Sequence, residues 1–268
     1  MKIKINNRPL ILVTNDDGVT AKGIDTLINV VKVFGDVVVV APGRAMSGMS
    51  HAITTRIPLY LRTVKKEEGL SVYKSNGSPA DCVKIAVNYL LDRKPDFVVS
   101  GINHGSNSSV SMHYSGTMGG AREGTLFGIP SIAFSLLDYR ADADFSTASY
   151  YVGEIFRWVF EHGIAKGVSY NVNIPPGDNL KGIKICRQAK GRWVEQFERR
   201  VDPRGRDYFW LTGYYDNHEP DATDTDEWAL ANNYVSLVPC SVDATDFESV
   251  ERLKENGLES VPSHIASV

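Results

Sequence analysis

The stretch that decides the fold is residues 10–24, LILVTNDDGVTAKGI, in which an apolar run ends in two adjacent carboxylates, Asp16 and Asp17. Adjacent unpaired anions repel each other strongly away from bulk water, so their charge must be compensated. A divalent cation is the obvious compensating group. The alternative is a strand-ending turn in which both carboxylates face water and cap a following helix, because Asp-Asp-Gly is a common turn former.

Four further apolar runs resemble the one that begins at Leu10. They are short and continuous, which is typical of strands covered on both faces. Segments with apolar residues at helical spacing separate them, and the order β-α-β-α-β predicts an open, mostly parallel α/β sheet. The expected strands are residues 10–14, 36–41, 96–100, 131–135 and 169–174, and the expected helices are 26–34, 80–91, 121–128 and a helix within 144–163 that ends at Gly163.

The composition is that of an ordinary globular chain. Its 268 residues, 43% hydrophobic and 23% charged, suffice for one large domain or a domain with an appendage. A net charge of -3 gives no general attraction to a nucleic acid duplex or to anionic lipid. The three cysteines are far apart and lack CxxC spacing, which argues against disulfides or structural zinc. No apolar run is long enough for a signal peptide or a membrane span, so we expect a cytoplasmic protein that contacts no membrane.

From Gly177 the character of the chain changes. Two aromatic-rich segments, residues 193–201 and 207–215, flank a Pro-Arg-Gly sequence at 203–205 that favours a hairpin. An exposed aromatic hairpin suggests exchange between subunits, and an intramolecular flap is the alternative. We therefore divide the chain, within what we expect to be a single domain, into a catalytic core of residues 1–176 and a C-terminal hairpin and oligomerisation segment of residues 177–268.

The segment that follows the hairpin, residues 215–227, is acidic. It contains six Asp or Glu residues and no Lys or Arg. One interpretation is a second cation site. The other is a solvated loop in which an Asp or Thr caps a short helix at 227–231, and we favour it because helix caps commonly use these residue types.

Polar, glycine-rich segments follow the first three of these strands, and a fourth such segment leads into a helix. In open α/β sheets, ligands bind beyond the carboxyl ends of the strands, so these segments are expected to meet at one edge. Asp16 and Asp17 can reach one ion only if the chain leaves the pleat there, and Gly18 makes that easy because glycine adopts positive φ. The four segments are residues 15–18, 42–48, 101–107 and 114–120.

A magnesium or manganese ion fits the residues of these segments. Both ions prefer hard oxygen ligands in octahedral geometry and usually keep several waters. Asp16 and Asp17 would supply the charge, while the Asn103 amide oxygen and the Ser47 hydroxyl could complete the set. An Asx-turn at Asn103 and an ordinary loop hydroxyl at Ser47 are the alternatives. The sequence therefore predicts one divalent cation per subunit at these four side chains.

The segment SGTMGG, residues 115–120, suits an anion. Small residues that open a helix let backbone N–H groups approach an anion, and the helix dipole favours phosphate. Simple helix capping is the alternative for Ser115, Gly116 and Thr117. A cation next to such an anion-binding helix N-terminus is typical of sites that catalyse phosphoryl transfer. The candidate substrate-binding residues are these three together with Asn15, Gly48 and Asn107.

Several other polar residues near the loops have open or simpler roles. Ser78 before Pro79 predicts a helix N-cap with proline at the first helical position. Arg44 could bind a phosphate or a base, or could pair with a loop carboxylate. Three histidines are left outside the site, because a loop histidine usually makes one ordinary hydrogen bond. They are His51, His104 and His113.

Short motifs occur in a fixed order along nearly the whole chain. They are LVTNDDG at residues 12–18, AP at 41–42 followed by Ser47, HAIT at 51–54, NGSPADCV at 76–83, SGINHGSN at 100–107, YSGT at 114–117, and a later set between 225 and 239. In this order they resemble the SurE survival protein family of metal-dependent nucleotidases. The last thirty residues carry little of the resemblance.

The resemblance implies a function and an architecture. It implies a divalent-metal-dependent phosphomonoesterase that hydrolyses nucleoside 5'- and 3'-monophosphates, with a Rossmann-like three-layer core and a homodimer or homotetramer partly built by the C-terminal hairpin. It places the metal on Asp16, Asp17, Ser47 and Asn103. We take Asp16, Asp17 and Asn103 as the catalytic residues, with Asp16 as the candidate general base.

Two alternatives come from other classes of protein. A phosphorelay receiver domain also places an acidic pair after its first strand, but it needs a phospho-acceptor Asp after its third strand and a Lys after its fifth. Here those positions read Ser-Gly-Ile-Asn at 100–103 and Ile-Pro-Pro at 174–176, so the receiver lacks its nucleophile. A catalytically silent nucleotide and metal sensor with the same site remains the alternative.

Overall fold

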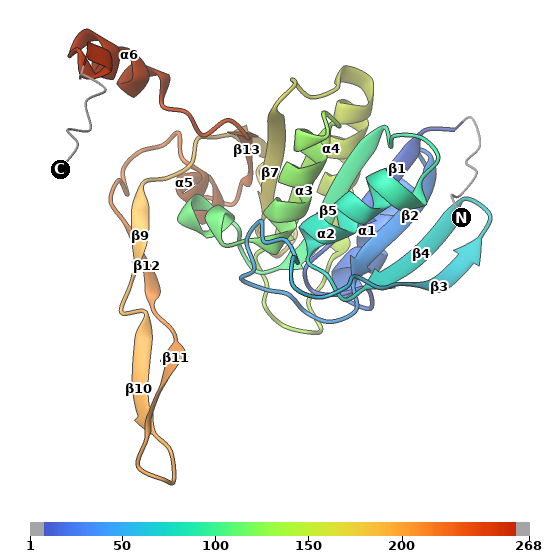
Figure 1. Ribbon diagram of the computed structural model, residues 1–268, viewed down its shortest axis with the longest axis horizontal. Helices are drawn as coiled ribbons and strands as arrows, with labels where there is room; N and C mark the ends of the chain where they lie inside the picture. Colours follow the sequence, from blue (N-terminus) through green and yellow to red (C-terminus); the bar gives the residue numbers. More distant parts are fainter. Residues whose placement is uncertain (1–7, 261–268) are drawn as a thin grey trace, which may run out of the picture.

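The computed structural model describes residues 8–260, which form one central sheet with helices on both faces and a long arm at one end (Figure 1). The sheet has nine strands in the order β3-β4-β2-β1-β5-β6-β7-β13-β8. Their bounds are β1 Leu10–Thr14, β2 Asp36–Pro42, β3 Leu61–Glu67, β4 Leu70–Ser75, β5 Phe97–His104, β6 Ser131–Leu136, β7 Val168–Ile174, β8 Ile183–Ile185 and β13 Val235–Ser241. The helices are α1 Lys22–Val31, α2 Pro79–Ile85, α3 Gly116–Leu126, α4 Ser146–His162, α5 Asp226–Ala231 and α6 Phe247–Glu255.

Six neighbouring strands, from β4 to β7, run parallel, and this confirms the predicted mostly parallel sheet. Strands β3 and β13 flank them in antiparallel orientation, and β8 pairs with β13 in parallel. All five predicted strands are present. The other four strands of this sheet, β3, β4, β8 and β13, were not predicted. Strand β3 reads LRTVKKE and is mostly exposed, and β8 has only three residues.

Strand β1 shows why the predicted runs are continuously apolar. Its residues Ile11 and Val13 belong to the hydrophobic core on the side of α1 and α4, whereas Leu10 and Leu12 belong to the core on the side of α2. Because successive side chains point to opposite faces, a strand with a core on each face must be apolar at every position. The sequence pattern therefore reports the three-layer architecture directly.

Helix α3 begins at Gly116, within the segment 115–120 that was expected to open a helix, so the helical run predicted from 121 was five residues too short. Its first turns are glycine-rich and lack an apolar stripe, because the helix packs closely on the sheet. A Cβ at Gly120 would lie 2.7 Å from Thr14 Cγ2, which leaves room only for glycine. The predicted N-cap at Ser78 is confirmed: its side chain accepts from Asp81 N–H in a capping box, and Pro79 is the first residue of α2.

The C-terminal segment forms the arm and then returns to the sheet (Figure 1). The predicted hairpin is confirmed as two antiparallel pairs, β9 Gly191–Val194 with β12 Tyr214–Asn217, and β10 Phe197–Val201 with β11 Asp207–Leu211. Beyond the arm, β13 joins the central sheet beside β7, so residues of the predicted core and of the predicted C-terminal segment share one sheet. The predicted core began at residue 1 and the predicted C-terminal segment ended at residue 268, and of these two parts residues 1–7 and 261–268 lie outside the described residues.

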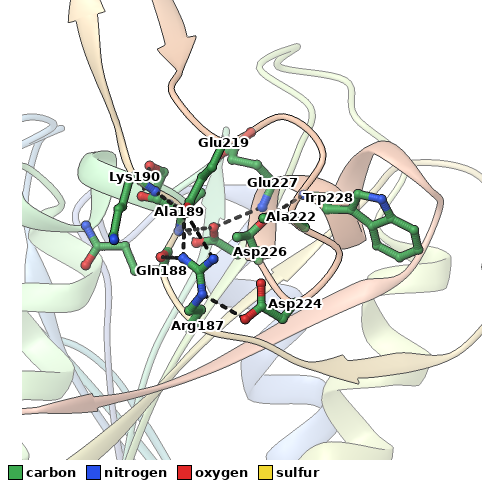
Figure 2. A network of polar contacts seen from close by, with 12 residues as sticks. Arg187, Gln188, Ala189, Lys190, Glu219, Ala222, Asp224, Asp226, Glu227 and Trp228 are labelled. Atoms are coloured by element: carbon green, nitrogen blue, oxygen red, sulfur yellow. Dashed lines mark hydrogen bonds and ion pairs between the residues drawn. The ribbon is translucent and has the colours of Figure 1, made fainter.

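The acidic segment is held by a network of polar contacts around Arg187 (Figure 2). Arg187 pairs with Glu219 and Asp224, and Thr225 caps α5 by accepting from Trp228 N–H. Asp226 is fully buried and accepts the backbone N–H groups of Ser109, Ala189 and Glu227, although burial raises the pKa of its carboxyl. The predicted helix cap is confirmed, but the segment is not simply a solvated loop.

Replacing Asp226 with Ala should lower the free energy of unfolding by at least about 2 kcal/mol, because three backbone N–H groups would be left buried without an acceptor. The matched control is Asp221→Ala, an exposed carboxylate in the same segment that should change stability little. Urea unfolding followed by circular dichroism measures both. Equal midpoints for the two variants would show that the Asp226 contacts do not stabilise the fold.

Candidate functional site

Asp16 lies at the centre of the carboxyl edge of the sheet, against the start of α3. Its side chain is only 3% exposed, and its Oδ1 accepts the hydroxyl of Thr117. A Cβ on Gly116 would lie 2.9 Å from Asp16 Oδ2, so the helix start fits closely against the carboxylate. Burial, with a smaller contribution from the Asp17 charge, raises the pKa of Asp16 to about 6.

Asp17 connects the end of β1 to the end of β5. Its Oδ2 accepts the backbone N–H of His104 at 3.0 Å, and burial raises the pKa of its carboxyl. The neighbouring Asn103 is nearly buried, and its Nδ2 donates to Gly105 O at 2.9 Å. With its amide nitrogen held in this way, Asn103 Oδ1 accepts no hydrogen bond from residues 8–260 and is available as a ligand.

The loop after β2 bridges the two sides of the site. At one end Met46 N–H donates to Asp16 O at 2.7 Å, and at the other Ser50 N–H donates to Tyr114 O at 2.9 Å. Ser47 and Gly48 lie between these anchors in an exposed turn, with Gly48 at φ +74°. The loop therefore runs from the end of β1 to the start of α3, and Ser47 lies one residue after the anchor at Met46.

The start of α3 divides its donors between the helix and Asp16. Ser115 is the N-cap, and its Oγ accepts Met118 N–H at 3.0 Å. Thr117 directs its hydroxyl to Asp16, and its backbone N–H also favours the Asp16 carboxylate. The capping alternative for this segment is thus correct for Ser115, while the Thr117 hydroxyl orients Asp16. The Gly116 N–H and the Ser115 hydroxyl hydrogen remain as donors for an anion at the positive end of the helix.

Asn15 is fully buried beside the acidic pair. Its Nδ2 donates to Gly18 O at 2.9 Å and closes the turn in which Gly18 has φ +104°. Its Oδ1 is buried and has no hydrogen-bond partner within the described part of the chain. Such an unsatisfied acceptor costs free energy unless a donor reaches it, so this atom suits a ligand hydroxyl or a water molecule.

Asn107 lies in a buried asparagine network below the loop that follows β5. Its backbone N–H donates to Asn173 Oδ1, its Nδ2 donates to Ser135 Oγ, and its carbonyl accepts from Asn171 Nδ2, each at 2.8 Å. These contacts fix the 104–108 loop on β6 and β7. The sequence signal for this network was the alternating Asn-Val-Asn of β7, which was interpreted only as strand.

The three histidine rings each make a polar contact with a distant part of the chain. His51 Nε2 lies 2.8 Å from Glu123 Oε2, and His104 Nδ1 lies 3.1 Å from Arg140 O. His113 faces Gln188, with 3.4 Å between their Nε2 atoms. These contacts anchor the segments that carry the three histidines.

The residues at this edge fit a divalent cation. Neither Asp16 nor Asp17 forms an ion pair with a Lys or Arg in residues 8–260, and burial raises both carboxyl pKa values, which is the sign of uncompensated negative charge. No three His, Cys, Asp or Glu side chains converge on a common point in this range. Two carboxylates with neutral amide and hydroxyl oxygens nearby form a donor set of hard oxygens, which would suit Mg²⁺ or Mn²⁺ better than Zn²⁺.

The fold and the site together define a class of protein. An open, mostly parallel sheet carries buried Asp16, half-buried Asp17 and a helix N-terminus at its carboxyl edge, which is where α/β proteins of the doubly wound class bind their ligands. Within residues 8–260, no helix has the length and apolar character needed to cross a bilayer.

The chain belongs to the Survival protein SurE family, which its sequence matches over residues 11–195. It is 54% identical over 253 residues to the 5'-nucleotidase SurE of Cytophaga hutchinsonii, covering 93% of this chain and 97% of that protein. It is 49% identical over 252 residues to the 5'-nucleotidase SurE of Phocaeicola vulgatus, covering 94% and 98%. The crystal structure of the SurE protein from Aquifex aeolicus superposes with a TM-score of 0.80 at 37% identity, covering 92% of this chain and 99% of that chain.

Proposed function

We propose that this protein is a divalent-metal-dependent 5'-nucleotidase, a phosphomonoesterase that releases phosphate from nucleoside 5'-monophosphates and also from 3'-monophosphates. The observation that carries the proposal is the acidic pair of buried Asp16 and half-buried Asp17, which contacts the start of α3 and the end of β5. The relatives that share almost its whole length are named 5'-nucleotidases, which supports the same activity.

One divalent cation per subunit, Mg²⁺ or Mn²⁺, would be held by Asp16, Asp17, Ser47 and Asn103 and would supply Lewis-acid stabilisation of the phosphoryl group. Ser115 and Gly116 bind the phosphate at the helix N-terminus, and Asn15, Gly48 and Asn107 shape the surrounding loops. Thr117 holds the Asp16 carboxylate in place through its hydroxyl. Asp16, whose pKa is raised to about 6, is the candidate acceptor for the proton of the attacking water.

A catalytically silent sensor with the same site is the second candidate. Incubating the protein with a panel of nucleoside 5'- and 3'-monophosphates and Mg²⁺ or Mn²⁺, followed by a phosphate assay, separates enzyme from sensor. We expect metal-dependent phosphate release from AMP or GMP. Tight nucleotide binding without any phosphate release would favour the sensor.

Replacing Asn103 with Ala should raise the metal concentration needed for half-maximal activity by about 10- to 100-fold, because a ligand oxygen is lost while both carboxylates remain. Titration of phosphate release against Mn²⁺ measures the shift. The control Asn88→Ala removes an exposed amide just beyond α2 and should leave the titration unchanged. An unaltered half-activation concentration in Asn103→Ala would remove this residue from the ligand set.

We also infer that the arm mediates assembly into a homodimer or homotetramer, which would make residues 177–268 an oligomerisation segment. Its strands β10 and β11 are exposed along their whole length and carry large apolar side chains, including Phe197, Phe209, Trp210 and Leu211. An exposed apolar patch of this kind marks an interaction surface. Light scattering on the full chain tests the assembly. The three cysteines are unpaired, which suits a reducing compartment, and we propose the cytoplasm.

A further inference from the structure

A cavity of about 420 Å³ lies between the loop after β2 and the hairpin formed by β3 and β4. These strands form one side of the sheet, away from the arm (Figure 1). The cavity lining contains three cationic side chains and no carboxylate. The residues that matter here are Arg44, Ile57, Tyr60, Arg62, Lys74 and Asn76.

Two of the three cations face each other across neighbouring strands. Arg62 on β3 is the direct partner of Lys74 on β4 in the antiparallel register. Like charges in this position are destabilising. Within residues 8–260, neither residue forms an ion pair, and neither does Arg44, so their positive charge is not compensated by the protein. An anion in the cavity would supply the compensation.

The backbone around the cavity is fixed by neutral contacts that do not involve the cations. Tyr60 N–H donates to Asn76 Oδ1 at 2.7 Å, and Asn76 Nδ2 donates to Pro58 O at 3.1 Å. Gly43 N–H donates to Ser75 O at 2.7 Å and joins the loop after β2 to the end of β4. A preformed wall keeps the ordering cost of binding low. Removing the cations should therefore leave the shape of the cavity intact.

The cavity adjoins the acidic pair through Arg44. A Cβ on Gly18 would lie 3.3 Å from the carbonyl carbon of Arg44, so the Arg44 backbone lies against the turn that follows Asp17. Two residues further on, Met46 N–H donates to Asp16 O. The loop after β2 thus contributes both to the cationic cavity, which attracts anions, and to the surroundings of the acidic pair, which attracts cations.

We propose that this cavity binds a phosphate group, at a site separate from the start of α3. Arginine and lysine are the side chains that bind phosphate most strongly, through charge-assisted hydrogen bonds. Tyr60 and Ile57 are 60% and 59% exposed and offer apolar surface to a sugar or ring attached to that phosphate. The ligand is either a second phosphate group on a nucleotide substrate or free inorganic phosphate. The first case rests on the proposed function.

Calorimetric titration of the metal-free full chain, kept in a chelator so that nothing is hydrolysed, tests the site. The probes are inorganic phosphate and adenosine 3',5'-bisphosphate. The double variant Arg62→Gln/Lys74→Gln is compared with Lys65→Gln/Lys66→Gln, which removes two charges from β3 outside the cavity lining. We expect at least about tenfold weaker binding of one or both probes in the first variant and wild-type binding in the second, since a charge-assisted hydrogen bond is lost. Unchanged binding of both probes in Arg62→Gln/Lys74→Gln would overturn the proposal.

Kinetics with Mn²⁺ then identify the source of the phosphate. If it belongs to the substrate, kcat/KM for adenosine 3',5'-bisphosphate falls about tenfold in Arg62→Gln/Lys74→Gln while kcat/KM for AMP is unchanged. If the site binds free phosphate, kcat/KM is unchanged for both adenosine 3',5'-bisphosphate and AMP, and only the calorimetric binding of inorganic phosphate is lost. Either source of the phosphate supports the site. Absence of any turnover by the wild-type protein would contradict the proposed function, and the metal-free titration would still decide the phosphate site.

Discussion

Replacing Asp16 with Asn is expected to lower metal-dependent hydrolysis of AMP by at least about a thousandfold, because one of the two proposed anionic ligands and the candidate base are lost together. Folding should survive. Asn has nearly the same shape, it keeps an oxygen for the Thr117 hydroxyl, and it removes a buried charge whose pKa is already raised to about 6. Phosphate release and the thermal midpoint of the metal-free protein measure the two effects.

The matched control is Asp178→Asn, which makes the same chemical change at an exposed position. It should leave both activity and the thermal midpoint unchanged. Near-normal turnover in Asp16→Asn would reject the assignment of Asp16 to catalysis. A large loss of stability in the metal-free variant would instead give the carboxylate a structural role.

Replacing Gly116 with Ala is expected to lower the activity by about 100-fold, because small misplacements of catalytic groups cost about this much. The added Cβ would lie 2.8 Å from Asp16 Cβ and 2.9 Å from its Oδ2. The side chain of Asp16 is short and buried and is held by Thr117, so the clash must displace the carboxylate or the start of α3. Measuring kcat together with the Mn²⁺ concentration for half activity detects the displacement.

Gly153→Ala provides the control, since it adds the same methyl group to a helical glycine of α4. There the new Cβ would meet only Val30 Cγ1 at 3.6 Å, an ordinary contact. Removing a helical glycine should raise stability by about 0.5–1 kcal/mol without affecting activity. If Gly116→Ala were as active as Gly153→Ala, the close packing of α3 on Asp16 would not matter for function.

The buried strands and the polar segments after them could be predicted from the sequence because both are local signals. An apolar run such as residues 10–14 needs a core on each face, and the fold has one on each side of β1. A Gly-containing acidic turn after such a run must lie at the carboxyl edge of a parallel sheet. The prediction that the four segments meet is supported by the contacts Asp16–Met46, Asp16–Thr117 and Asp17–His104.

What could not be predicted depends on contacts between distant parts of the chain. The helical run of α3 was predicted too short, from 121, because its first glycines serve the sheet and the Asp16 carboxylate rather than an apolar stripe. Strand β3 was missed because it lies at one side of the sheet with polar residues on both faces. Asp226 looked like one acid among six, and only the fold brings Ser109 and Ala189 to its carboxylate. Arg62 and Lys74 become a pair only through the register of β3 and β4.

The central claim is that oxygens of Asp16, Asp17, Ser47 and Asn103, which come from three separate connections of the sheet, surround one divalent cation. Crystals grown or soaked with Mn²⁺ and measured near the manganese absorption edge test it directly. The account predicts one anomalous peak per subunit, within coordination distance of the Asp16 and Asp17 carboxylates. A map with no peak there, or with its strongest peak bound to other residues, would contradict it.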